Sequence, residues 1–121
     1  MSGYPGKMPF EVQDVVRGDH HTLVLTGELD IAQAAELETM IHELSADGIS
    51  GITLDLRKLT FMGSTGLRLV LLTREVCASH RYQFFLIPGS KNVQHLFKIT
   101  GLLDALPFKT AVSGEDTHEP A

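Results

Sequence analysis

The spacing of apolar residues changes repeatedly along this chain, and no other feature of the sequence restricts the fold as strongly. Apolar and polar residues alternate within 10–16 and again within 22–26, with 17–21 between them as turn residues. From residue 34 onward the apolar residues recur at spacings of three and four. Alternation is typical of strands, and spacings of three and four are typical of amphipathic helices. The sequence therefore predicts a β-hairpin followed by a helix.

The predicted first helix has both a start signal and a stop signal. Asp30 and Gln33 have the spacing of a capping box, and Asp47 with Gly48 ends the pattern. The helix should have about four turns. Its apolar face comprises Ala34, Leu37, Met40, Ile41 and Leu44.

The remainder of the chain repeats the order strand, helix. The expected elements are a strand at 52–56, a helix at 64–79, a strand at 83–87, a helix beginning at Ser90 or Asn92 and ending near Gly101, and a short strand at 106–109. The helix at 64–79 is apolar almost all round in its first turns, which indicates that it is covered on more than one side. Alternating strands and helices predict parallel pairing through right-handed crossovers. The expected fold class is α/β, a small mixed sheet of an antiparallel hairpin and then parallel strands, with helices packed against it.

Composition excludes several classes of protein. A chain of 121 residues with 43% apolar and 21% charged residues is typical of one globular domain. The net charge of −5 argues against nucleic acid as a direct partner. No window reaches the roughly 18 apolar residues of a membrane span, so membrane insertion is not expected. Cys77 is the single cysteine, which favours a reducing, cytoplasmic location. Cys77 itself is interpreted as a small buried hydrophobe, with a redox role as the alternative.

Charge is distributed unevenly along the sequence. Residues 28–55 hold seven acids and no Lys or Arg, whereas residues 57–109 hold eight bases and two acids. The acidic run is either a solvated helix face or a surface for a partner with basic groups. Residues 1–9 are expected to be a flexible N-terminus and 10–110 the domain. The polar end, 111–121, is expected to be disordered.

The turn after the strand at 52–56 is the first place to look for function, because ligands of α/β sheets bind beyond the carboxyl ends of the strands. Residues 60–67 read TFMGSTGL, with two hydroxyls and two glycines. If this turn has only a structural role, Ser64 or Thr65 is the N-cap of the following helix and Gly63 has a positive φ. The stretch fits neither the nucleophile elbow nor a phosphate-binding loop, and the six histidines have no metal-ligand spacing. No catalytic residue, metal or cofactor is therefore predicted.

Three segments of the chain resemble the STAS domain of bacterial anti-sigma factor antagonists. They are 25–30 (LTGELD), 54–56 followed by 59–67 (LDL, LTFMGSTGL), and 93–97 followed by 100–102 (VQHLF, TGL). The resemblance covers roughly residues 10–109. It implies a regulatory protein, not an enzyme, that binds an anti-sigma factor with serine/threonine kinase activity and so frees a sigma factor. Phosphorylation would end this partner switching, and a serine/threonine phosphatase would restore it.

The resemblance also assigns roles to individual residues. In the family's D-S-[ST]-G pattern the phosphoacceptor is the third position, which is Thr65 here, and Ser64 is the less favoured acceptor. Gly66 matches the fourth position of the pattern. Gly63 stands where the family has Asp, so a carboxylate beside the acceptor is missing. The family often ends in a further helix, and residues 111–114 predict that this helix is short or absent. The residues expected to contact the partner are Asp30, Phe61, Met62, Leu67 and Arg68.

Some of these expectations have alternatives. Phe61 and Met62 are candidates for interface anchors, although core burial is the favoured interpretation of Phe61. Arg68 lies one turn after Thr65 and would pair with a phosphate there, or it is simply solvated. The chain could instead be the STAS subunit of another assembly, such as a lipid-transport complex or a stress-signalling scaffold. A small-ligand or nucleotide-binding domain would use the same helix N-terminus to bind an anion.

Overall fold

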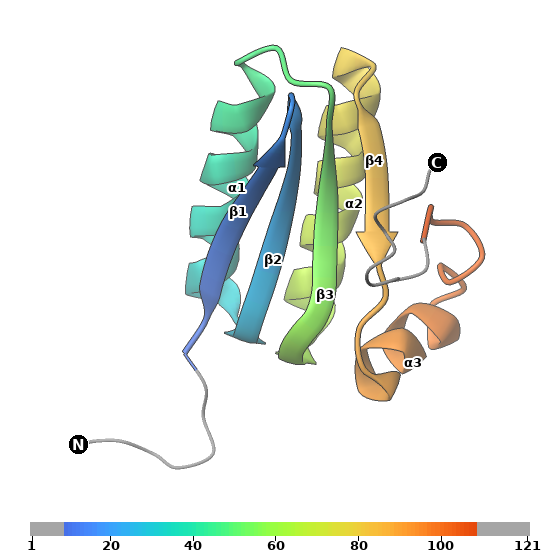
Figure 1. Cartoon of the computed structure of the whole chain (residues 1–121). Helices are drawn as coiled ribbons and strands as arrows, with labels where there is room; N and C mark the ends of the chain where they lie inside the picture. Colours follow the sequence, from blue (N-terminus) through green and yellow to red (C-terminus); the bar gives the residue numbers. More distant parts are fainter. Residues whose placement is uncertain (1–8, 109–121) are drawn as a thin grey trace.

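The computed structural model describes residues 9–108, which form a four-stranded sheet in the order β1-β2-β3-β4 (Figure 1). The hairpin of β1 and β2 is antiparallel, whereas β2/β3 and β3/β4 are parallel. This arrangement confirms the predicted mixed α/β fold. The elements are β1 (Glu11–Arg17), β2 (His20–Leu29), α1 (Ile31–Ser45), β3 (Gly51–Met62), α2 (Ser64–His80), β4 (Gln83–Ile87) and α3 (Lys91–Ile99).

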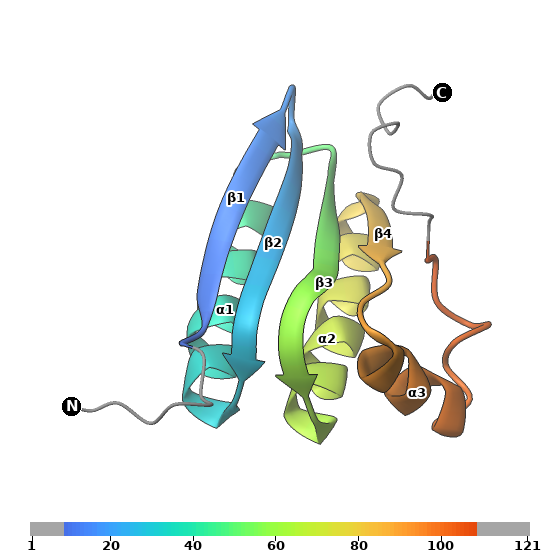
Figure 2. The same ribbon diagram turned by 60° about the horizontal axis from the view of Figure 1, so that its bottom comes forward.

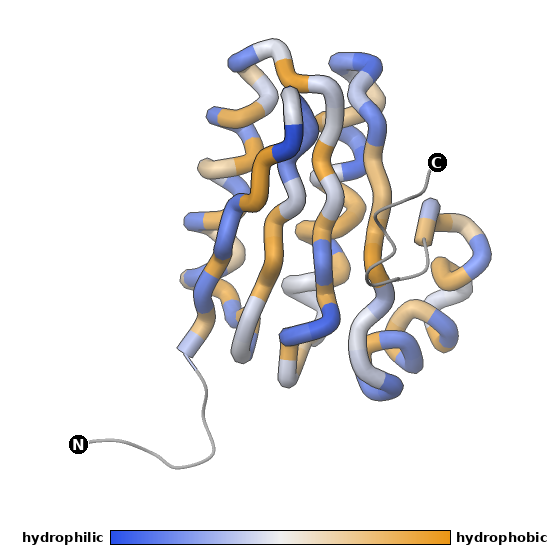
Figure 3. Tube along the Cα trace, in the orientation of Figure 1, coloured by the Kyte–Doolittle hydropathy of each residue, from blue (hydrophilic) through white to orange (hydrophobic). Residues whose placement is uncertain are grey.

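The main core lies between the sheet and two helices. Both views show α1 and α2 side by side on one face of the sheet, with α3 beyond the carboxyl end of β4 (Figures 1 and 2). Hydropathy along the chain follows this layering, since apolar segments run through the central strands (Figure 3). Alternate strand residues point at the helices. The fully buried ones include Leu23, Leu25, Ile52, Leu54 and Leu86.

Strand β3 is much longer than the five residues predicted for it. The sequence suggested a turn after residue 56 because Arg57 and Lys58 interrupt the apolar pattern. In the structure β3 continues to Met62, paired with β2, and the register shifts between Val24 and Thr26 and between Gly27 and Glu28. These irregularities leave Arg57 and Lys58 exposed while Leu59 and Met62 remain buried. Pairing with the long strand β2 therefore outweighs the local charge of β3.

The helix boundaries agree closely with the sequence patterns. Asp30 caps α1 by accepting a hydrogen bond from the Gln33 N–H at 3.3 Å, and Ser90, not Asn92, caps α3. The expected last strand is reduced to a single bridge between Leu86 and Phe108. The predictions for residues 1–8 and 109–121, including the domain end at 110 and the short or absent helix, lie outside the described residues.

Cys77 is fully buried, as the sequence suggested for a small hydrophobe. Burial raises the pKa of its thiol from 9.0 to about 11, with a smaller opposing effect of a hydrogen bond to the Ile52 backbone. Because the thiolate is the nucleophile, its concentration at pH 8 falls by about 100-fold. We expect iodoacetamide to alkylate the native protein at least that much more slowly than the urea-unfolded protein, as followed by mass spectrometry. Equal rates would contradict this burial.

Candidate functional site

The N-termini of α1 and α2 lie next to each other because β2 and β3 are parallel and end together. Leu29 pairs with Met62 in the last position of the ladder. One residue further along each chain segment, Asp30 and Gly63 begin the two helices. The sheet thus brings together two motifs that are more than 30 residues apart in the sequence, as a parallel sheet does at the carboxyl ends of its strands.

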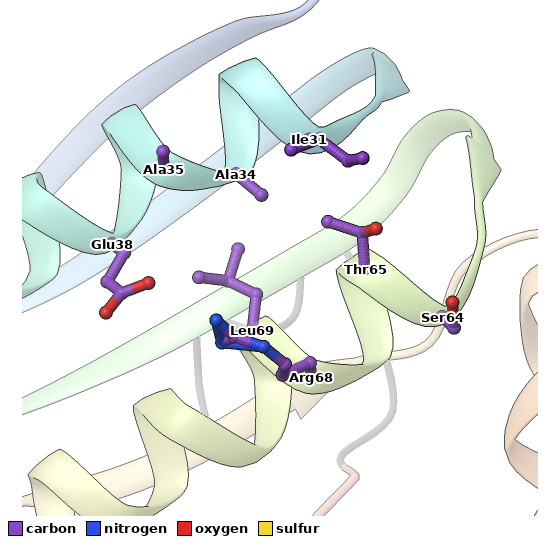
Figure 4. A pocket seen from close by; sticks show the side chains of 8 residues that line it. All are labelled: Ile31, Ala34, Ala35, Glu38, Ser64, Thr65, Arg68 and Leu69. Carbon is purple, nitrogen blue, oxygen red and sulfur yellow. The ribbon is translucent and has the colours of Figure 1, made fainter.

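A groove of about 420 Å³ separates the first turns of these helices. Thr65 points from α2 toward α1 and Ile31, whereas Ser64 lies on the outer side of the turn (Figure 4). Thr65 is partly buried and Ser64 is exposed. Arg68 lines the α2 side of the same groove, one turn after Thr65.

The groove also has an acidic side. Glu38 extends from α1 into it (Figure 4). Two other acids of the run in 28–55, Glu36 and Glu43, are exposed on α1. Of these acids, only Glu38 lines the groove together with Thr65.

The first turn of α2 is not capped by a side chain. Gly63 is the N-cap residue with φ −101° and ψ −154°, and its carbonyl accepts the first helical hydrogen bond, from the Leu67 N–H at 3.1 Å. The expectations of a positive φ at Gly63 and of an N-cap at Ser64 or Thr65 are therefore wrong. Because glycine has no side-chain acceptor, the N–H groups at the start of α2 keep their hydrogen-bonding capacity for a ligand or a modification.

Gly66 holds the same turn close to the sheet. A Cβ atom at this position would collide with Met62 Cγ and would lie 2.9 Å from Met62 Sδ and 3.1 Å from Leu29 Cδ2. Met62 is only 5% exposed, so it is packed beneath the turn and is not an accessible interface anchor. Gly66 and Met62 thus fix the position of Thr65 relative to the ends of β2 and β3.

Exposed apolar side chains surround this turn. Phe61 is 56% exposed, against the expectation of core burial, and its ring lies 3.3 Å from where a Cβ of Gly63 would be. A second groove of about 370 Å³ lies between the end of β3 and α3, lined by Phe61, Gly63 and Ile99 among others. Ile99 is 64% exposed, and Ile31, beside the first groove, is 76% exposed.

The other predicted contact residues lie at this end of the molecule with different exposure. Asp30 is exposed but serves as the cap of α1, and Leu67 is partly buried against the core. The sequence analysis did not identify Ile31 and Ile99. Ile31 lies three residues before Ala34, which is the spacing of the buried stripe itself, so the sequence pattern gave no sign that it is exposed.

Two histidines of the hairpin have structural contacts. His20 forms a hydrogen bond with Thr53 at 2.7 Å, and His21 pairs with Asp14 at 2.8 Å. Between residues 9 and 108, no three His, Cys, Asp or Glu side chains are grouped so that they would bind a metal ion. No helix in that same range is long and apolar enough to cross a membrane.

Comparison with known proteins gives a consistent set of relatives. Anti-sigma-B factor antagonists of Staphylococcus aureus and Staphylococcus epidermidis are 27% and 26% identical over 99 residues, which cover 82% of this chain and 92% of theirs. The solved structure of the anti-sigma factor antagonist SpoIIAA in its unphosphorylated form has a TM-score of 0.76. It is 24% identical, and the match covers 90% of this chain and 93% of that one.

A second solved structure shows the same fold. The phosphorylated form of the Bacillus cell fate determinant SpoIIAA matches with a TM-score of 0.72 and 23% identity, covering 90% of this chain and 96% of its own. The family model of the STAS domain matches residues 11–114, which is most of the chain. The order of the strands and helices, the relatives and the family model agree, and the chain belongs to the STAS domain family.

Proposed function

We propose that this chain is an anti-sigma factor antagonist, a regulatory binding protein without catalytic activity, and that the surface around the first turn of α2 binds the anti-sigma factor. The names and nearly full-length coverage of the staphylococcal relatives support this role. The single observation that carries it is the position of Thr65. Its side chain lies in a groove at an uncapped helix N-terminus, with Ile31, Phe61 and Ile99 exposed on the neighbouring elements.

Phosphorylation of Thr65 is the proposed switch. A phosphate there would meet the N–H groups of the first turn of α2, where the helix dipole favours negative charge. Arg68 lines the same groove and supplies a guanidinium group for a charge-assisted hydrogen bond. Such a site stabilises an anion by about 0.3 to 1 kcal/mol when exposed, so the fold should tolerate the modification.

The effect on binding should be much larger than the effect on folding. An interface that covers Thr65 with apolar side chains would have to desolvate a group with a charge of nearly −2. An unpaired buried charge costs several kcal/mol, and about 1.4 kcal/mol corresponds to a tenfold loss of affinity. The modified protein should therefore dissociate from its partner while it remains folded. The partner is proposed to be an anti-sigma factor with serine/threonine kinase activity, and a phosphatase would reverse the modification.

Replacing Gly63 should change the free energy of unfolding by a measurable amount. Its φ and ψ are accessible to any residue, and the nearest obstacle to a Cβ is the exposed ring of Phe61. We expect Gly63→Ser to cap α2 and to stabilise the protein by about 0.5 to 1 kcal/mol in urea unfolding. Gly18→Ser is the matched control. Gly18 has φ +61°, a conformation that residues with a side chain disfavour, so this substitution should lower the free energy of unfolding. Equal losses of stability in both variants would contradict the N-cap assignment.

Direct binding tests the proposed function. Each anti-sigma factor with a kinase domain encoded by the source genome would be purified and titrated with this chain in a calorimeter. We expect one of them to bind with 1:1 stoichiometry and to release its sigma factor on binding. If none of them binds the unmodified chain, the proposed role as an antagonist is wrong.

A further inference from the structure

The sheet has a second face that no helix within residues 9–108 covers. Both α1 and α2 pack on the opposite face (Figures 1 and 2). The register identifies the side chains of this helix-free face, because paired residues of neighbouring strands point the same way. One row contains Thr22, Thr53 and Phe85, and the next row contains Val24, Asp55 and Ile87.

Part of this face is as buried as the core. Thr53 is 1% exposed and Asp55 is 3% exposed. The imidazole of His20 hydrogen-bonds to the Thr53 hydroxyl, and the Arg57 guanidinium donates to both Asp55 carboxylate oxygens at 3.0 and 2.7 Å.

The neighbouring strand adds apolar surface to this buried part. Phe85 and Ile87 of β4 point to the same side and are partly buried. The β3–β4 half of the face therefore combines apolar side chains with polar groups that are withdrawn from water, which is typical of a covered surface.

The described chain ends next to this half of the face. Phe108 forms a parallel bridge with Leu86 on the outer edge of β4, and the Leu86 N–H donates to the Pro107 carbonyl at 3.1 Å. Residues 109–121 follow, and the part of the chain that matches the STAS family reaches residue 114. Thirteen extended residues span about 43 Å, whereas crossing three strand spacings needs only about 14 Å. Residues 109–121 are therefore long enough to cross the sheet.

The composition of residues 109–121 complements this surface. After Lys109 and Thr110 come the apolar Ala111 and Val112, and the acids Glu115, Asp116 and Glu119 follow. We propose that this C-terminal segment folds back over the β3–β4 half of the helix-free face, with Ala111 and Val112 against Phe85 and Ile87. Its acidic residues then lie toward Arg57. The segment is the occupant of this face in the full chain.

Paramagnetic broadening in the full-length protein tests this placement. A nitroxide on Ser113→Cys would be the only label, since native Cys77 is fully buried. We expect strong loss of the amide signals of Thr53, Asp55 and Phe85, with the signals of α1 retained. A nitroxide on Ser79→Cys, at the exposed end of α2, is the matched control and should leave the β3–β4 signals stronger than the Ser113 label does.

Two further samples define the outcome. Adding Ala111→Asp and Val112→Asp to the Ser113→Cys protein should restore the lost signals, because charged side chains cannot pack on Phe85 and Ile87. A mixture of labelled and isotope-enriched unlabelled molecules should show no loss. The proposal is overturned if the Ser113 label leaves the β3–β4 amides unchanged, if the double Asp substitution has no effect, or if the mixed sample shows that a second copy supplies the label.

Discussion

Thr65→Glu should reduce the affinity for the anti-sigma factor by about 100-fold or more while leaving the protein folded. The substitution places a carboxylate in the groove between α1 and α2, at the uncapped start of α2. In the free protein the helix dipole favours this charge, but an apolar interface would have to bury it. A cost of about 3 kcal/mol corresponds to two orders of magnitude in affinity. Calorimetric titration with the purified anti-sigma factor measures the loss.

Two control variants separate the charge from its position. Ser79→Glu introduces the same charge at the exposed C-terminal end of α2, about 20 Å away along the helix, and should bind like the wild type. Thr65→Val keeps the shape of the side chain without the hydroxyl and should bind within a few-fold of the wild type. Unchanged binding by Thr65→Glu would show that Thr65 is not the switch, even if the chain binds an anti-sigma factor.

Phe97→Ala should cause the largest loss of stability, about 3 to 5 kcal/mol in urea unfolding. Phe97 is fully buried and its ring meets that of Phe108 edge to face, with the centroids 5.1 Å apart. Its carbonyl also accepts hydrogen bonds from the Leu102 and Leu103 N–H groups. The substitution leaves these backbone hydrogen bonds in place, but it removes the ring that packs against Phe108 beside the bridge to β4, and it leaves a cavity there.

The same substitution at Phe61 provides the control. Phe61 is 56% exposed, so Phe61→Ala should change stability by less than about 1 kcal/mol while it weakens partner binding. The two variants should thus separate stability from binding. A loss below about 1 kcal/mol for Phe97→Ala would mean that α3 does not depend on this core contact.

The sequence predicted those elements whose stability is local. Helix α1 combines a cap at Asp30 with a continuous apolar stripe, and both signals lie within the segment that forms the helix. The second half of β3 could not be predicted in this way, because Arg57 and Lys58 break the pattern and the strand is held by pairing with β2. A pairing partner more than 30 residues away leaves no trace in the local spacing of apolar residues.

The candidate site was predictable in its position but not in its construction. The motif placed Thr65 at the start of a helix, and the structure agrees. The roles of the neighbouring residues depend on packing, which reverses the expectations for Phe61 and Met62: the first is exposed and the second is buried under Gly66. Ile31 and Ile99 join the site only because α1 and α3 reach the same end of the sheet.

The most direct test compares the binding of this chain before and after phosphorylation. The purified protein would be phosphorylated by its anti-sigma factor kinase with ATP, and mass spectrometry would locate the phosphate. The two forms would then be titrated into the same anti-sigma factor without ATP. We predict a phosphate on Thr65 and a loss of affinity of at least about 100-fold in a protein that stays folded. A phosphate on another residue, or equal affinity of the two forms, would contradict the account.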